Sequence, residues 1–315
     1  MVHLIDSLHL GSPNIICIAL VEDTPDQLVM IDSGPESVFE SVVTSIEQLG
    51  FRPENVRHLL ASHIHLDHTG GAWRWAKEFG TQIYVHPRGA PHLINPEMLV
   101  ASATQIYREK MDYLWGKTEA IAEEQVTMVD DGATLSFRTK AFQAIYTPGH
   151  AQHHNAYWLS SENVVFAGDV AGVIIGDGPS VPPFPPPDIH LELWKQSLDR
   201  IRALQPAFIY VTHFGKISSP LPMLDGFEHR LFAWADWIKQ RLLEEKSDSE
   251  IIPEFQAFVK QSLIAVGVNP QNLLTYEQAA PPATSVAGLS RYWRKYHPEQ
   301  VPAVNPQRSG VTLSD

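Results

Sequence analysis

The segment SHIHLDHTGG, residues 62–71, places three histidines and one aspartate within six positions, as His63, His65, Asp67 and His68. It begins at the end of the apolar run VRHLLAS, which predicts a buried strand, so the histidines lie in the loop after a strand. In an extended stretch alternate residues point the same way, so the first two histidines and the aspartate share a face, and a turn adds the third histidine. Imidazole and carboxylate ligands without thiolates suit Zn²⁺, Fe or Mn. The segment therefore predicts a metal site, in a geometry that suits two ions.

The first part of the chain alternates between β-branched runs and helical periodicity. Residues 14–21 and 27–31 predict a hairpin across the polar turn EDTPD, with its second strand ending at Asp32. The elements predicted next are a helix over 37–50, the strand that leads to the histidines, a helix over 70–80 and a strand over 81–86. Such an alternation is typical of an α/β domain.

Residues 96–124 have a helical pattern that interrupts this alternation, and they are predicted to be an inserted helical segment. Strands follow, and we expect them to form a second, mostly antiparallel sheet. These strands are predicted at 126–129, 133–137, 141–146, 155–159 and 163–167. The loop GDGPSVPPFPPP, residues 176–187, holds six of the 24 prolines, which stiffen it into an extended conformation. Such a loop suits either the rim of an active site or a spacer.

The C-terminal part of the chain begins with a predicted helix over 192–205 and a strand that runs into His213. After Pro222 apolar residues recur at helical spacing, including Trp234 and Trp293. The sequence therefore predicts one domain over 1–222 and a C-terminal helical region over 223–315. Aromatic residues on these helices suit either a homodimer interface or packing against the core.

Composition excludes several classes of function. The chain has 36 acidic and 23 basic residues, a net charge of −13, which argues against general nucleic-acid binding. The single cysteine, Cys17, excludes an internal disulfide and any site built from several thiolates. The N-terminus has no cationic segment before an apolar core, and its longest apolar run falls far short of the ~20 residues that a membrane helix needs. We expect a soluble, cytoplasmic protein that acts on a small molecule.

Five motifs in order resemble the metallo-β-lactamase superfamily. The HxHxDH pattern of residues 63–68 is accompanied by IDSG at 31–34, TPGH at 147–150, AGD at 167–169 and VTHFG at 211–215. The layout is most similar to the glyoxalase II-like branch. This resemblance covers about residues 1–220 and implies an α/β fold, the four-layer αββα sandwich of that family, here with a helical insertion and a C-terminal helical extension.

The resemblance also implies a role for each residue of the motifs. In that family the first metal would be held by His63, His65 and His150. The second would be held by Asp67, His68 and His213. Asp169 would bridge the two metals. Asp32 resembles the carboxylate that orients a ligand histidine in this family, although an aspartate that ends a strand at a turn is the alternative. His154 is expected beside the site. His153 is left unassigned, and the remaining histidines, His9 among them, are expected to be structural or at the surface.

A dinuclear site of this kind implies hydrolysis. Two divalent ions, Zn²⁺ by preference, would lower the pKa of water and supply a nucleophile at neutral pH, with Asp67 and Asp169 as catalytic residues that orient it. The resemblance favours an ester or thioester substrate. A lactonase or phosphodiesterase of the same fold is the alternative, as is an iron-dependent oxidoreductase of the sulfur dioxygenase kind that holds one ion on His63, His150 and Asp169. The basic, aromatic segment RYWRKYH, residues 291–297, suits either a glutathione grip or an amphipathic packing helix.

Overall fold

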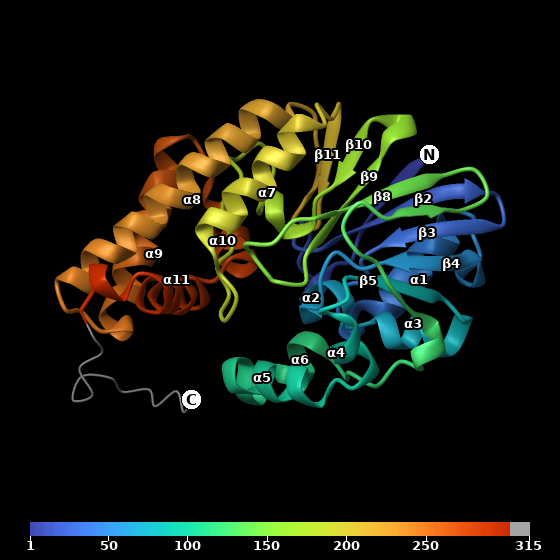
Figure 1. The fold of residues 1–315 in the computed structure, drawn as a ribbon, viewed down its shortest axis with the longest axis horizontal. Helices are drawn as coiled ribbons and strands as arrows, with labels where there is room; N and C mark the ends of the chain where they lie inside the picture. The colour runs from blue at the N-terminus through green and yellow to red at the C-terminus, as the bar shows by residue number, and fades with distance from the viewer. Residues whose placement is uncertain (303–315) are drawn as a thin grey trace.

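The computed structural model describes residues 1–302, and its centre is a pair of six-stranded β-sheets (Figure 1). The strands of the first sheet, in spatial order, are β1 (Val2–Asp6), β2 (Cys17–Thr24), β3 (Gln27–Ile31), β4 (Val56–Leu60), β5 (Gln82–Val85) and β6 (Val126–Met128). Those of the second are β12 (Gly215–Ile217), β11 (Phe208–Val211), β10 (Val164–Phe166), β9 (Asn155–Leu159), β8 (Ala141–Tyr146) and β7 (Thr134–Ser136).

The first sheet is mixed. The strands β1, β2 and β3 pair antiparallel, and β3 to β6 run parallel to one another. The predicted hairpin is confirmed as β2 and β3. The strand β1 was missed, and one prediction was wrong, because the strand at 126–129 was assigned to the second sheet. It pairs instead with β5 in parallel, because the inserted helices return the chain to the free edge of the first sheet, and residues 129–133 then cross to the second.

The second sheet is mostly antiparallel, as predicted, with one parallel pair between β10 and β11. The side chains of the two inner faces form one apolar layer between the sheets, which includes Val29, Leu60, Tyr157 and Phe166. Such packing of two sheets buries alternate residues of each strand. The short strand β12 was not predicted, because three residues do not establish a strand pattern.

Helices cover the outer face of each sheet. On the first sheet, α1 (Phe39–Gln48) and α3 (Ala72–Phe79) bury apolar stripes that include Val42, Ile46 and Trp75. On the second, α7 (Leu191–Ala203) buries Trp194 and Leu198. The order helix, sheet, sheet, helix is the predicted four-layer αββα sandwich.

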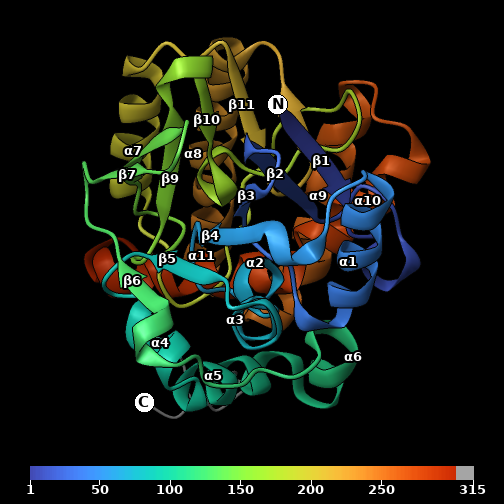
Figure 2. The ribbon, with the colours of Figure 1, turned by 90° about the vertical axis from the view of Figure 1, so that its right-hand side faces the viewer.

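The helical insertion consists of α4 (Ala90–Ile94), α5 (Glu97–Tyr107) and α6 (Met111–Trp115). Figure 2 shows these helices together beyond α2 (Leu66–Thr69) and α3. The predicted helical segment over 96–124 is therefore correct only to residue 115. Residues 116–122 contain no regular element, and Gly116, at φ +71°, follows α6 at its C-terminus.

Four C-terminal helices extend the second helical layer: α8 (Pro220–Leu243), α9 (Asp248–Ala265), α10 (Pro270–Ala279) and α11 (Pro282–Tyr296). Their aromatic residues, including Trp234, Phe255 and Trp293, belong to the same apolar cluster as Trp194 of α7. The helices thus pack on the core of the sandwich. Part of the predicted region, 303–315, lies outside the described residues. Among residues 1–302, no helix is long and apolar enough to cross a membrane.

Candidate metal centre

The predicted ligands come together at one edge of the sandwich, beyond the carboxyl ends of four strands. His63 and His65 follow β4, and Asp67 and His68 lie in the one-turn helix α2. The prediction that an extended stretch puts Asp67 on the face of His63 and His65 was therefore wrong, because the chain turns into a helix at Leu66. In the second sheet β8, β10 and β11 run in the same direction, because two antiparallel pairs separate β8 from β10 and the third strand pairs in parallel. The ligands that follow these strands are His150 after β8, Asp169 after β10 and His213 after β11.

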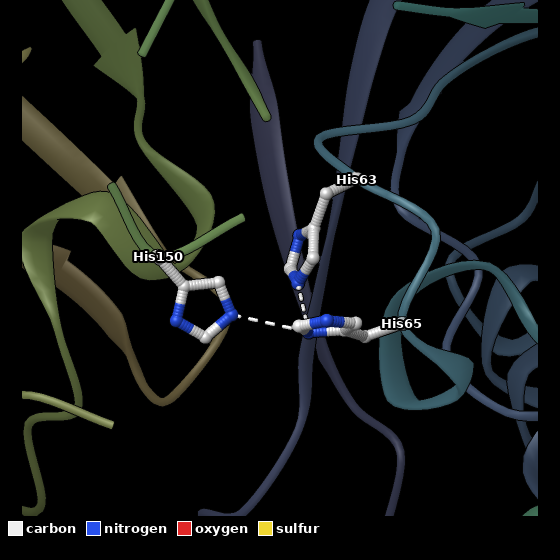
Figure 3. Close-up of side chains that lie close together, drawn as sticks. All are labelled: His63, His65 and His150. Atoms are coloured by element: carbon white, nitrogen blue, oxygen red, sulfur yellow. Dashed lines mark hydrogen bonds between the residues drawn. The ribbon is translucent and has the colours of Figure 1, made fainter. Parts of the chain in front are cut away.

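The first group of ring nitrogens belongs to three histidines. Nε2 of His63 lies 2.9 Å from Nδ1 of His65, and Nε2 of His150 lies 3.1 Å from the same Nδ1. Figure 3 shows the three rings turned toward one another, with the two close contacts meeting at His65. Two segments of chain, the loop after β4 and the loop after β8, thus direct three nitrogens to a common point, which is the arrangement of a three-histidine metal site.

A second group lies beside the first. Oδ2 of Asp67 is 3.8 Å from Nε2 of His68 and 3.4 Å from Nε2 of His213. These three atoms lie close enough together to hold one ion. His68 and His213 are fully buried or nearly so, and the Asp67 side chain is about a quarter exposed. The second group therefore has the more open approach.

Asp169 lies between the two groups and presents one carboxylate oxygen to each. Its Oδ2 is 3.3 Å from Nε2 of His150 in the first group. Its Oδ1 is 3.3 Å from Nε2 of His68 and 3.6 Å from Nε2 of His213 in the second. This is the placement that a bridging ligand requires.

Hydrogen bonds on the far side of the rings fix which nitrogen faces the site. Nδ1 of His150 lies 3.2 Å from the carbonyl oxygen of Pro183, and Nδ1 of His213 lies 2.6 Å from that of Ile15. A carbonyl only accepts, so each Nδ1 carries the proton and donates. In the neutral form of both rings Nε2 is then the unprotonated nitrogen, and it is directed into the site, as a metal ligand must be.

Asp32 holds the second layer of the site together. Its Oδ2 accepts hydrogen bonds from Nδ1 of His68 at 2.8 Å, from Ser62 Oγ at 2.8 Å and from Thr212 Oγ1 at 3.0 Å. Its Oδ1 accepts from the Ser62 backbone N–H at 2.7 Å. Because the single hydroxyl proton of Ser62 is donated to Asp32, its oxygen is free to accept from Nδ1 of His63 at 3.0 Å. Sequence reasoning had identified Asp32 but missed Ser62 and Thr212, although both lie inside the motifs SHIHLDHTGG and VTHFG.

His154 contacts the site through the backbone. Its Nδ1 lies 2.8 Å from Thr147 Oγ1, and the backbone N–H of Asp169 donates to its Nε2 at 3.3 Å. It thus lies beside the predicted ligands. His153, which was left unassigned, accepts from the backbone N–H of Ile64 at 3.4 Å and packs its ring edge-on to His65.

Charge states follow from burial and from the two carboxylates. Burial lowers the pKa of His63 and His65, and lowers the pKa of His150 to about 3, so these rings are neutral. For His68 and His213 burial opposes the charged form, but the nearby carboxylates, Asp169 first, raise the pKa of both rings above the usual value. These two imidazoles face the greatest negative charge, which is where a cation is stabilised most.

The same charges act on the carboxyl groups in the opposite direction. Burial favours the neutral acid, but the imidazoles of His68 and His213 hold the pKa of Asp67 and Asp169 well below the usual range. Both side chains are therefore carboxylates at neutral pH. Two carboxylates and five imidazoles facing one space form a donor set suited to divalent ions.

Unpaired atoms at the centre test whether metal ions fit. Within residues 1–302, Nε2 of His68 and Oδ1 of Asp169 are buried and have no hydrogen-bond partner, although they lie 3.3 Å apart. Buried polar atoms are almost always paired, since leaving one unpaired costs about 1–3 kcal/mol. An ion held between the two atoms removes that cost, so the residues fit the metal centre that the motifs predict.

The comparison with protein families agrees with this geometry. A model of the metallo-beta-lactamase superfamily matches residues 13–213, which include every predicted ligand. The chain belongs to the metallo-beta-lactamase superfamily. The helices from α8 onward lie outside the matched range.

The similar proteins are distant from this chain in sequence. A metallo-beta-lactamase fold-containing protein of Sulfurisphaera tokodaii is 25% identical over 193 residues, which cover 60% of this chain and 69% of that protein. The atrochrysone carboxyl ACP thioesterase of Aspergillus fumigatus is 31% identical over 194 residues, which cover 60% of this chain and 48% of that enzyme. The chain thus spans about half the length of the fungal relatives that it matches.

Solved structures show the same fold over nearly the whole chain. A metallo-beta-lactamase family protein from Thermus thermophilus superposes with a TM-score of 0.68 at 18% identity, covering 94% of this chain and 93% of that one. The archaeal superfamily protein from Sulfolobus tokodaii superposes with a TM-score of 0.65 at 19% identity, covering 92% of this chain and 98% of that one. Both superpositions cover more of this chain than residues 13–213, which the family model matches. The similarity of fold therefore extends into the C-terminal helices.

Proposed function

We propose that this protein is a metal-dependent hydrolase of an ester or thioester bond. The observation that carries the proposal is the position of Asp169, whose two oxygens face the two groups of histidines at 3.3 Å each. The first ion would be held by His63, His65 and His150, and the second by Asp67, His68 and His213, with Asp169 shared. When bound, such ions lower the pKa of water toward 7 and polarise a carbonyl oxygen.

The protein's own residues have distinct tasks in this reaction. Asp67 and Asp169 are ionised and can only accept hydrogen bonds, so they orient the attacking water by its protons. Asp67 is the more exposed of the two, and its lowered pKa suits it to orienting the water rather than to removing its proton. His154 is a poor proton acceptor, because Thr147 and the Asp169 backbone engage both of its ring nitrogens.

The choice of substrate class rests on the relatives and on charge. The fungal relative named as an acyl-carrier thioesterase supports a thioester, although the match covers only about half of that enzyme. The net charge of −13 disfavours a polyanionic nucleic-acid substrate. A small ester or thioester is therefore the first class to test.

The contacts of the proline-rich loop, residues 176–187, support its interpretation as part of the rim of the active site. Its Pro183 carbonyl accepts from His150, and Phe184 packs edge-on against Trp194 in the buried core. The C-terminal helices fix the loop further, since Tyr276 donates to the Pro179 carbonyl at 2.6 Å. The loop is thus a rigid support of one predicted ligand.

The experiment that tests the proposal combines metal analysis with a hydrolysis screen. The purified protein should contain about two divalent ions per chain, in keeping with the two ligand groups, and should cleave a member of an ester, thioester, lactone and phosphodiester panel. His65→Ala should lose metal and activity, while His229→Ala, which removes an exposed histidine of α8, should lose neither.

Two results of that experiment would contradict the proposal. One is a protein loaded with two zinc ions that cleaves no member of the panel. The other is a single iron per chain together with oxygen uptake on a persulfide, which would establish the oxidoreductase alternative instead.

A further inference from the structure

His9 lies in the turn Leu8–Gly11 between β1 and β2, and was expected to be structural or at the surface. Its imidazole is buried and stacks on the indole of Trp115 in α6, with ring centroids 5.5 Å apart and planes at 9°. Trp115 in turn meets Tyr107 of α5 edge-on at 5.1 Å. The turn after β1 and the helical insertion are thus joined by three rings.

This ring cluster lies on the Asp67 and His213 side of the metal centre. Burial has the largest effect on the pKa of His9 and of Tyr107, lowering the first and raising the second, and Asp67 is close enough to both, and His213 to His9, for their charges to act on these pKa values as well. The same N-terminal segment also supplies the Ile15 carbonyl that accepts from His213 at 2.6 Å. The cluster therefore borders the more open of the two ligand groups.

Two polar atoms of the cluster are unpaired. Nδ1 of His9 and Nε1 of Trp115 are buried, and neither finds a hydrogen-bond partner in the part of the chain that the structure describes. An indole N–H can only donate, so the missing partner of Trp115 is an acceptor. Buried donors without partners are rare in native proteins, and a ligand oxygen is one explanation.

Apolar side chains flank these rings and reach solvent. Leu8 and Leu10, on either side of His9, are 52% and 40% exposed, and Ile106, beside Tyr107, is 42% exposed. Both leucines have positive φ angles, 51° and 52°, a conformation that non-glycine residues adopt rarely. The backbone of the turn is held in a strained conformation that presents apolar groups next to the ring cluster.

We propose that His9, Trp115 and Tyr107, with Leu8 and Leu10, form an acyl-binding wall that selects substrates by an apolar acyl group larger than acetyl, bearing an oxygen that accepts from Trp115 Nε1. The inference rests on the proposed hydrolase function and adds the acyl class to it. Nδ1 of His9 and Nε1 of Trp115 are covered by other side chains in this structure. The bound acyl group therefore displaces the side chains that cover these two atoms.

The test uses the full chain as purified, with its own metal, and two analogues that cannot be hydrolysed. These are thioethers of N-acetylcysteamine, one with an acetonyl group and one with a 4-methoxyphenacyl group, in which a methylene separates carbonyl from sulfur. Calorimetry should show that the wild type binds the methoxyphenacyl compound at least about tenfold more tightly, from the added burial of an aryl group.

Three variants examine the wall. Trp115→Phe keeps the stacked ring but removes the N–H, and should weaken binding of the methoxyphenacyl compound about fivefold without changing that of the acetonyl compound. Leu10→Asn removes the apolar group with a residue that tolerates positive φ, and should reduce the preference to a similar extent. Trp158→Phe is the matched control, because its Nε1 is also buried without a partner in residues 1–302 but belongs to β9.

Equal affinity of the wild type for the two analogues, or an unchanged preference in both Trp115→Phe and Leu10→Asn, would overturn the wall. The proposed hydrolase function fails separately, by the absence of turnover on the ester and thioester panel. If the protein prefers the aryl analogue but cleaves nothing, the acyl-binding wall is supported and the hydrolase function is contradicted. If it cleaves a substrate but shows no preference between the analogues, the hydrolase function is supported and the wall is contradicted.

Discussion

Oδ2 of Asp32 accepts a hydrogen bond from Nδ1 of His68 at 2.8 Å, and neither side chain is exposed by more than about 1%. The two residues lie 36 positions apart: Asp32 directly follows β3, and His68 lies in α2, in the connection that follows β4. Since β3 and β4 run parallel, their carboxyl ends meet at one edge of the sheet. The bond sets the tautomer of His68 and directs its Nε2 at Asp169.

Asp32→Asn should therefore lower metal affinity without removing a ligand. The amide replaces one acceptor oxygen with a donor, which then faces other donors. We expect affinity for one of the two ions to fall about 10- to 100-fold, the usual effect of losing such a partner. Chelator competition measures the change, and Asp26→Asn, at an exposed aspartate, is the control. Equal chelator midpoints for Asp32→Asn and the wild type would show that Asp32 is only a turn residue.

Asp169→Ala should abolish binding of at least one ion and turnover with it. The variant removes the only carboxylate that approaches both His150 and His68 among the described residues. Metal stoichiometry and hydrolysis rates give the readout, with Asp177→Ala in the exposed part of the proline-rich loop as a control. If both ions and the full rate survive in Asp169→Ala, the bridging assignment is wrong.

Asp23 makes the stability of the fold depend on pH in a way that does not involve metal binding. Burial of this carboxyl favours the acid, but the backbone N–H groups of Arg138, Thr139 and Lys140 donate to it and lower its pKa on balance. A lowered folded-state pKa means that the ionised group stabilises the fold above the unfolded pKa of about 3.9, and that this contribution is lost as the pH falls through the folded value.

The variant for this test is Asp23→Asn, which places an amide donor against backbone donors. We expect it to cost about 1–3 kcal/mol in the free energy of unfolding at pH 7. The difference from the wild type should close as the pH falls below 4, the window set by the lowered pKa. Denaturant unfolding at pH 7, 5 and 3 measures it, and a difference that widened toward acid would contradict the assigned sign.

Gly288 of α11 connects the C-terminal helices to the metal centre. A Cβ at this position would lie 1.9 Å from the carbonyl oxygen of Phe184, next to the Pro183 carbonyl that holds His150. Gly288→Ala should therefore destabilise the fold by about 1–3 kcal/mol and weaken binding of the first ion.

A matched control lies in α8, where a Cβ on Gly226 would meet only the flexible end of Arg230. Gly226→Ala should be neutral or stabilising by up to about 1 kcal/mol, because alanine favours helix over glycine. Thermal unfolding and metal titration distinguish the two variants. Similar behaviour of both would mean that α11 does not support the proline-rich loop.

The predictions from sequence succeeded where neighbouring residues carry the signal. The residue types of SHIHLDHTGG predicted four donors close together after a strand, and the structure brings the four together there. The predicted extended path through Asp67 was wrong, because Leu66–Thr69 form the helix α2. The helices α1, α3 and α7 were predicted because each has apolar residues at helical spacing. The predictions failed at the short strands β1 and β12 and in the pairing of β6, which depends on a distant strand edge.

By itself, then, the sequence determined the chemistry of the donors and the turn that gathers four of them, because both depend on residues that are close in the chain. Only the tertiary structure decided that the two oxygens of Asp169 face different groups of histidines. It alone also brought the carbonyls of Ile15 and Pro183 and the rings of His9 and Trp115 to the site. These contacts join segments tens to hundreds of residues apart, and no local pattern encodes them, because they arise from the packing of two sheets and an insertion.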